Sequence, residues 1–136
     1  MSLPDTQTII DDLGFFDDWE ERYQYIIDLG RELPPMDDTL KTPERLVKGC
    51  QSNVWLDVDK QGETLRFTVD SDAHIVRGLL VLVIAAFDNK TPAEILAFDI
   101  DDYFRQLDLE QHLSPTRGNG LRAIVGKIRA IAQAVT

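Results

Sequence analysis

Residues 54–70, Val-Trp-Leu-Asp-Val-Asp-Lys-Gln-Gly-Glu-Thr-Leu-Arg-Phe-Thr-Val-Asp, carry the pattern of a β-hairpin. Apolar and polar side chains alternate through residues 54–59 and again through residues 65–70. The Lys-Gln-Gly segment at 60–62 predicts the turn between them. Period-two alternation around a glycine-containing turn is typical of two antiparallel strands with one buried face and one solvated face.

The segment before the hairpin has a helical pattern. Residues 6–13 form a short predicted helix that ends at Gly14. A second helix, capped by Asp17 or Asp18, runs to about Leu33, where two prolines stop it. One face of this second helix carries residues that we interpret as core: Trp19, Tyr23, Ile26, Ile27 and Gly30.

The segment after the hairpin is predicted to be helical again. Ser71 or Asp72 caps an apolar helix that reaches Phe87, and Thr-Pro-Ala-Glu at 91–94 forms a capping box. Ser114, followed by proline, opens the last helix. That helix has an apolar stripe with spacings of three and four: Leu121, Ile124, Val125, Ile128, Ile131, Ala132 and Val135.

An acidic trio lies between these helices. Asp99, Asp101 and Asp102 stand at the start of a short predicted helix, where carboxylates complement the helix dipole, so we interpret them as structural rather than metal-binding. A third, short strand is predicted around residues 46–48. Helices, then strands, then helices, without βαβ alternation, indicate one α+β domain over residues 1–136, in which about three antiparallel strands pack against helices.

Length and charge restrict the possible functions. The chain has 136 residues and a net charge of −10, from 24 acidic and 14 basic side chains. Nucleic acid is not an expected partner, because phosphate binding requires a basic patch. The acidity favours solubility, or an acidic face that steers a basic protein partner. No apolar run approaches the ~20 residues needed to span a membrane, and no signal peptide is visible, so a reducing cytoplasm is predicted.

Cys50 is the only cysteine, so it cannot form a disulfide within the chain. One interpretation is a small buried apolar residue, as free cysteines often are. The other is a nucleophile, because a thiol that follows Gly49 at the entrance to a strand can project from a loop tip. Arg45 and Lys48 could favour its thiolate, or they could be ordinary surface charges.

The sequence around Cys50 strongly resembles the core of the SufE family, sulfur-acceptor proteins that serve cysteine desulfurases. The matching residues are 49–55, Gly-Cys-Gln-Ser-Asn-Val-Trp. Residues 71–79 (Ser-Asp-Ala-His-Ile-Val-Arg-Gly-Leu) and 113–121 (Leu-Ser-Pro-Thr-Arg-Gly-Asn-Gly-Leu) resemble two further family elements. These blocks occur in the family order and span nearly the whole chain. Lys48 departs from the pattern, since many relatives have proline or alanine there.

The resemblance implies a fold shared by SufE and IscU proteins. It also implies that Cys50 takes persulfide sulfur from a pyridoxal-phosphate-dependent cysteine desulfurase, of the SufS or CsdA type, and stimulates that enzyme. The sulfur would pass to an iron–sulfur scaffold or another acceptor, and the chain would be neither an enzyme nor a cofactor carrier. Six further residues are candidates for support of the loop, the site or the partner contact: Gly49, Gln51, Ser52, Asp72, Arg117 and Asn119.

Other functions remain as alternatives. A cysteine hydrolase would need His74 or His112 as a base, with a further group to orient it. A metal or cluster site is disfavoured, because one cysteine and two histidines cannot supply four ligands without carboxylates. A protein-interaction module without chemistry is the third alternative.

The loop itself is predicted to shelter the thiol. Gln51 and Ser52 can fold it through local hydrogen bonds, while Val54 and Trp55 anchor its far end in the sheet. The glycine before the cysteine supplies a hinge. We therefore expect Cys50 to lie against apolar surface in the free protein.

Overall fold

The predicted hairpin is present in the computed structural model, which describes residues 3–135. Strand β1 (Val54–Gln61) pairs antiparallel with β2 (Thr64–Ser71), and Val54 lies opposite Ser71. The alternation sends one set of side chains into the core: Val54, Leu56, Leu65, Phe67 and Val69.

The turn of the hairpin lies later than the sequence predicted. Lys60 and Gln61 belong to β1, and the two-residue turn is formed by Gly62 and Glu63. Gly62 has a φ of 63°. Two-residue turns with glycine in this left-handed region match the twist of the strands that they join, which extends the pairing beyond the expected end.

The predicted third strand is reduced to a single bridge, between Leu46 and Trp55. The N–H of Val47 donates to the carbonyl oxygen of Val54 at 2.8 Å. The preceding residues are wound into a 3₁₀ helix, η2 (Pro43–Arg45), and the next glycine turns the chain with a φ of 95°. Too little extended backbone is therefore left to pair as a strand, and within the described residues the sheet has two strands rather than three.

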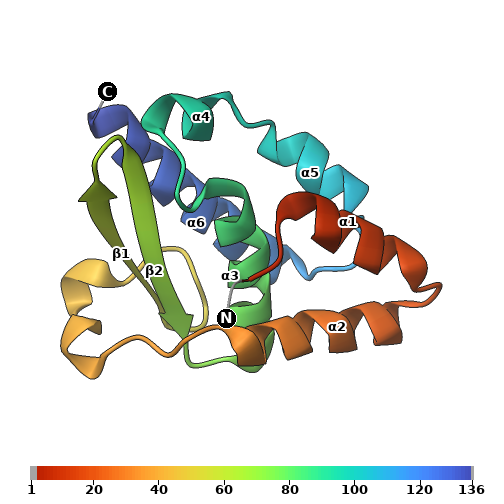
Figure 1. Ribbon diagram of the computed structural model, residues 1–136. Coiled ribbons are helices and arrows are strands. Elements are labelled where there is room, and N and C mark those ends of the chain that lie inside the picture. The colour runs from red at the N-terminus through yellow and green to blue at the C-terminus, as the bar shows by residue number, and fades with distance from the viewer. Residues whose placement is uncertain (1–2, 136) are drawn as a thin grey trace.

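The hairpin lies at one edge of the molecule, and α3 occupies the centre (Figure 1). The bounds are α1 (Thr6–Phe15), α2 (Trp19–Glu32), η1 (Asp38–Leu40), α3 (His74–Phe87), α4 (Pro92–Ala97), α5 (Ile100–Gln106) and α6 (Pro115–Ala134). In Figure 1, α2 runs across one end of α3 and α6 lies behind it, which gives an α+β fold. Within residues 3–135, none of the helices is both long and apolar enough to cross a membrane.

Several helix starts follow the predicted cap chemistry. Asp18 accepts the N–H of the third residue of α2, and Asp99 does the same at α5. Thr91 and Glu94 form the complete capping box of α4. Ser114 caps α6 in the same manner as Asp18. These contacts bridge only three residues, which is why local sequence predicts them.

Two predicted helix ends were wrong. Helix α1 continues through Gly14 to Phe15, because Gly14 does not adopt the left-handed conformation with which glycine often ends a helix. Helix α3 begins after Ala73, which makes no side-chain cap. The hydroxyl of Ser71 accepts the N–H of Ala73 at 3.3 Å outside the helix, and Asp72 is engaged elsewhere.

The end of β2 is fastened to the end of α2 by a buried ionic cluster. Asp70 is 2% exposed, accepts the N–H of Met36 at 3.0 Å, and pairs with Arg77 and Lys41. Arg77 also donates to the carbonyl of Leu33. Burial by itself raises the pKa of Asp70, but two backbone N–H groups and two cations outweigh it and lower the pKa.

Candidate functional site

Cys50 lies on the loop between η2 and β1, and this loop rests on α6. Gly49 has a φ of 95°, and a Cβ built on it would lie 3.2 Å from the Cβ of Ala123. Cys50 is half-buried, and its S–H donates to the carbonyl oxygen of Gly120 with an S···O distance of 3.5 Å. The loop therefore needs glycine both for its backbone conformation and for its close approach to the helix.

The thiol of Cys50 packs against α6 at Gly120. A Cβ built there would lie 3.5 Å from the Sγ of Cys50 and 3.7 Å from its Cα. A Cβ at Gly118 in the same helix would meet nothing within 4 Å. The second glycine of the Arg-Gly-Asn-Gly element therefore lies beside the cysteine, where even a Cβ would make only ordinary van der Waals contact, and the first lies away from it.

A cavity of about 90 Å³ opens beside the thiol, and we call it the Cys50 cavity. Its apolar lining comes from β1, α3 and α6: Val54, Val76, Leu79, Leu121 and Ile124. Its polar lining comes from the loop and the start of α6: Gln51, Ser52, Ser114, Thr116 and Arg117. Among the residues that line it in the described chain, Arg117 is the only ionisable side chain apart from the thiol.

Burial raises the pKa of the Cys50 thiol. The two cations that the sequence proposed as helpers do not reverse this effect. Arg45 is held by the carboxylate of Asp57 at 2.8 Å and donates to the hydroxyl of Thr42, and Lys48 is exposed. Of the two interpretations left open for these cations, ordinary charges outside the site fit the structure, because neither Arg45 nor Lys48 lines the Cys50 cavity.

The raised pKa predicts slow alkylation of the resting thiol. At pH 8 we expect iodoacetamide to modify Cys50 in the folded protein several-fold more slowly than in urea-unfolded protein, whose thiol has a pKa of about 8.5. The folded rate should still rise with pH where the unfolded rate has levelled off, because a higher pKa delays thiolate formation. Equal, rapid labelling of both states would show that the thiol is already exposed.

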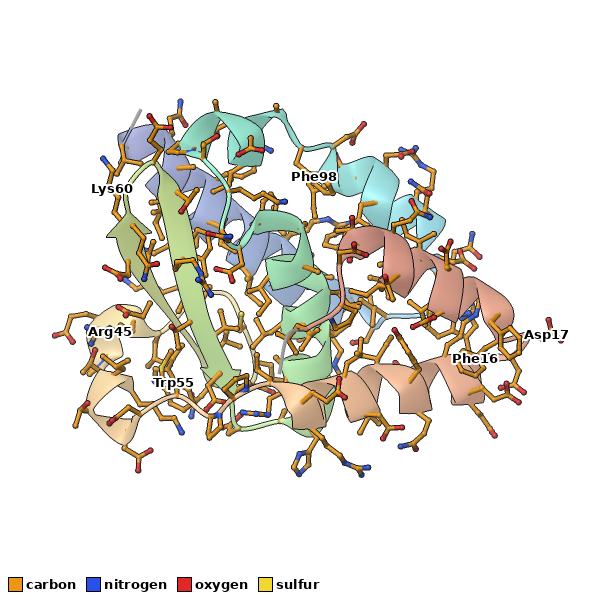
Figure 2. The ribbon with its side chains drawn as sticks, in the orientation of Figure 1. Phe16, Asp17, Arg45, Trp55, Lys60 and Phe98 are labelled. Atoms are coloured by element: carbon orange, nitrogen blue, oxygen red, sulfur yellow. The ribbon has the colours of Figure 1, made fainter. Side chains whose placement is uncertain are left out.

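The loop residues predicted to support the thiol lie at the cavity but act differently from the prediction. Gln51 and Ser52 line the Cys50 cavity, yet neither side chain forms a hydrogen bond within residues 3–135. The loop is instead held by its ends. Val54 is 1% exposed, and the ammonium group of Lys41 lies 5.3 Å from the ring centre of Trp55 (labelled in Figure 2).

The three candidates more distant in sequence, Asp72, Arg117 and Asn119, lie at different places relative to the Cys50 cavity. Arg117 lines the Cys50 cavity, whereas Asn119 is exposed and does not line it. Asp72 is also outside the lining, but its carboxylate accepts the N–H of Asn53 at 3.2 Å. Asp72 therefore ties the exit of the cysteine loop to the start of α3, a role that its expected position as a helix cap did not suggest.

Neither histidine reaches the thiol site. His112 stacks on Trp19 with ring centres 4.0 Å apart, and its Nε2 lies 3.5 Å from Asp108. His74 is exposed at the first position of α3. Neither lines the Cys50 cavity. The described part of the chain also contains no cluster of three or more His, Cys, Asp or Glu side chains that could hold a metal ion.

The apolar cavity wall was not predicted as part of the site. Val76 and Leu79 lie three residues apart on α3, as Leu121 and Ile124 do on α6, so each pair shares one helix face. That spacing identifies core-facing residues. It does not say which of them end beside a loop from a different part of the chain.

Comparison with known proteins shows which family this sequence belongs to. Residues 7–132 match the SufE family, described as an Fe-S metabolism associated domain. An uncharacterized SufE-like protein of Rhizobium meliloti (strain 1021) is 45% identical over 129 residues, covering 92% of both chains. An uncharacterized SufE-like protein of Rhizobium etli is 46% identical over 129 residues, covering 92% of this chain and 87% of that protein.

A solved structure has the same fold. The solution structure of a hypothetical protein from Thermus thermophilus aligns with a TM-score of 0.76, covering 98% of this chain and 97% of the other. The two sequences are 20% identical, so this likeness concerns the fold alone.

Proposed function

This chain belongs to the SufE family, which is associated with iron–sulfur metabolism, and on that premise we propose that it is a sulfur acceptor and activator of a cysteine desulfurase. Cys50 would take the sulfur and relay it toward iron–sulfur cluster assembly. One observation supports the proposal above the others. The sole thiol of the chain sits half-buried in a cavity that neither histidine nor any carboxylate among the described residues lines.

The proposed step needs only one sulfur nucleophile, the Cys50 thiolate, and one sulfur electrophile, the outer sulfur of a persulfide. The thiolate of Cys50 attacks the outer sulfur of a cysteine persulfide on the desulfurase. A new S–S bond forms at Cys50, the S–S bond of the donor breaks, and the donor cysteine leaves with the electron pair as a thiolate. No external oxidant or reductant is consumed. A chain with one cysteine suits this step, because a second thiol could convert the persulfide into a disulfide.

The cavity supports a sheltered resting state. Apolar surroundings and the hydrogen bond to Gly120 favour the protonated thiol, which is a poor nucleophile. Oxidation of sulfur follows thiolate character and access, so this position also protects the thiol.

We propose that Cys50 swings out of the cavity when the protein binds the desulfurase. Alkylation should accelerate when a desulfurase lacking its own nucleophilic cysteine is added, and an unchanged rate would contradict the swing.

Intact-mass analysis tests the proposed function directly. The protein is incubated with candidate pyridoxal-phosphate cysteine desulfurases and cysteine, then measured without reductant. We expect a gain in mass of one sulfur atom, located at Cys50. A protein-interaction module without chemistry would bind the desulfurase and gain no sulfur, so a complex without this mass increase overturns the acceptor role.

Replacement of the histidines tests the remaining enzymatic alternative. We expect His74→Ala and His112→Ala each to keep sulfur acceptance, because neither ring lines the Cys50 cavity. A Cys–His hydrolase would lose its base in one of the two variants. A loss above about tenfold (~1.4 kcal/mol of barrier), with fold and partner binding retained, would revive a catalytic dyad. His112→Ala needs a stability measurement beside it, since that ring stacks on Trp19.

A further inference from the structure

A second depression lies on the other side of the cysteine loop, and we call it the basic groove. It is an open depression of about 740 Å³ between the η2 segment and α6. Leu46, Val47 and Ala123 supply apolar surface, and Lys48 and Lys127 supply positive charge. Leu46 is 36% exposed, which makes it one of three large apolar side chains at the surface of the described chain.

The groove and the Cys50 cavity share no lining residue but share a wall. Residues 47 and 48 line the groove, and Cys50 lines the cavity. On α6, Ala123 borders the groove and Gly120 borders the cavity, one helical turn apart. The backbone of Gly49 packs on Ala123 between them. A protein that docks over the cysteine loop would therefore lie next to the groove.

The charge of the groove is opposite to that of the whole chain. The net charge is −10, yet Lys48 and Lys127 form no ion pair with any residue in the described range 3–135. Glu44 also borders the groove, and hydrogen bonds from its own N–H and from the hydroxyl of Thr42 lower the pKa of its carboxylate, which therefore stays ionised. With two lysines and one glutamate, the lining still carries a net positive charge. Lys48 does not lower the pKa of Cys50. Neither activation of the thiol nor a salt bridge therefore explains why a lysine stands at this position.

We propose that the basic groove binds an acidic segment of the desulfurase, one that carries an apolar side chain between carboxylates. The apolar side chain would pack on Leu46 and Ala123, and the carboxylates would pair with Lys48 and Lys127. This inference rests on the proposed function, and it assigns partner recognition to residues beside the transfer loop. Complementary charge at such a site raises the association rate and selects among partners.

Charge reversal tests the groove. The probe is the desulfurase that delivers sulfur to Cys50 in the mass experiment, with its own nucleophilic cysteine replaced by alanine. Its Kd is measured for the natural chain, for Lys48→Glu/Lys127→Glu and for Leu46→Ala. We expect the double variant to raise Kd about tenfold or more at low ionic strength, with a smaller difference at high salt. Leu46→Ala should weaken binding about equally at both salt concentrations.

The matched control is Lys60→Glu/Lys90→Glu, which changes the net charge equally on exposed residues outside both depressions. A Kd for the groove variant that equals this control overturns the inference. A natural chain that sediments as a dimer, with the groove variant monomeric, also overturns it by making the groove a self-interface. If no desulfurase delivers sulfur to Cys50, the proposed function has failed. If sulfur is delivered to Cys50 but the groove variant binds the desulfurase as tightly as the control does, only the inference about the groove fails.

Discussion

Cys50→Ser is expected to abolish both sulfur acceptance and stimulation of the desulfurase. The hydroxyl of serine is a far weaker nucleophile than a thiolate, and it cannot carry a persulfide. The fold should survive, because the side chain is only half-buried and the replacement removes no large apolar group. The expected result is therefore complete loss of chemistry without loss of structure.

The measurement pairs two readouts with one control. Intact mass reports sulfur on the chain, and alanine production reports turnover by the desulfurase. Asn119→Ala is a suitable control, because that side chain is exposed and does not line the Cys50 cavity, so it should keep both activities. Full stimulation by Cys50→Ser would be incompatible with the acceptor role and would point to activation by binding alone.

Gly78→Ala is expected to cost about 3 kcal/mol of unfolding free energy or more, at the upper end for overpacking. A Cβ at Gly78 would lie 2.0 Å from the carbonyl oxygen of Ile26, so α3 and α2 would have to move apart. Gly30 faces the same contact from α2, where a Cβ would lie 2.7 Å from the backbone nitrogen of Gly78. Both collisions are with backbone atoms, so a change of rotamer cannot relieve them.

Urea or thermal unfolding measures this cost, and Gly126→Ala provides the control. Gly126 is also helical, but a Cβ there would meet nothing within 4 Å. We expect this control to raise stability by up to about 1 kcal/mol, because alanine favours helix over glycine. For Gly78→Ala a loss of about 10 °C in Tm is expected for a chain of this size. A stability equal to the natural chain would show that the two helices are not so closely packed.

The position of the thiol along the chain was readable from sequence, but its surroundings were not. The motif at residues 49–55 places Cys50 at the entrance to β1. Its contact with Gly120 joins residues 70 positions apart. The raised pKa depends on that contact and on the apolar wall from α3 and α6. Arg45 was one of two possible helpers of the thiolate, and the carboxylate of Asp57 on β1 holds it instead.

By itself the sequence determined the elements whose cause is local. The alternation in residues 54–59 and 65–70 specifies the hairpin, because period two separates its two faces within one strand. Asp18, Ser114 and the capping box of α4 fix helix starts through contacts three residues long. Burial follows the apolar stripe of α6 as far as Ala132, but the predicted stripe residue Val135 is 42% exposed, because the helix ends at Ala134.

Only the tertiary structure decided which of these elements meet. Asp72 binds the N–H of Asn53 rather than capping α3, because the loop arrives there from another part of the chain. The expected third strand stopped at one bridge, since η2 and a left-handed glycine direct the backbone onto α6. The basic groove arises from the same path. Periodicity and capping act over a few residues. A cavity depends on how segments far apart in the sequence pack together, and no local pattern specifies that packing.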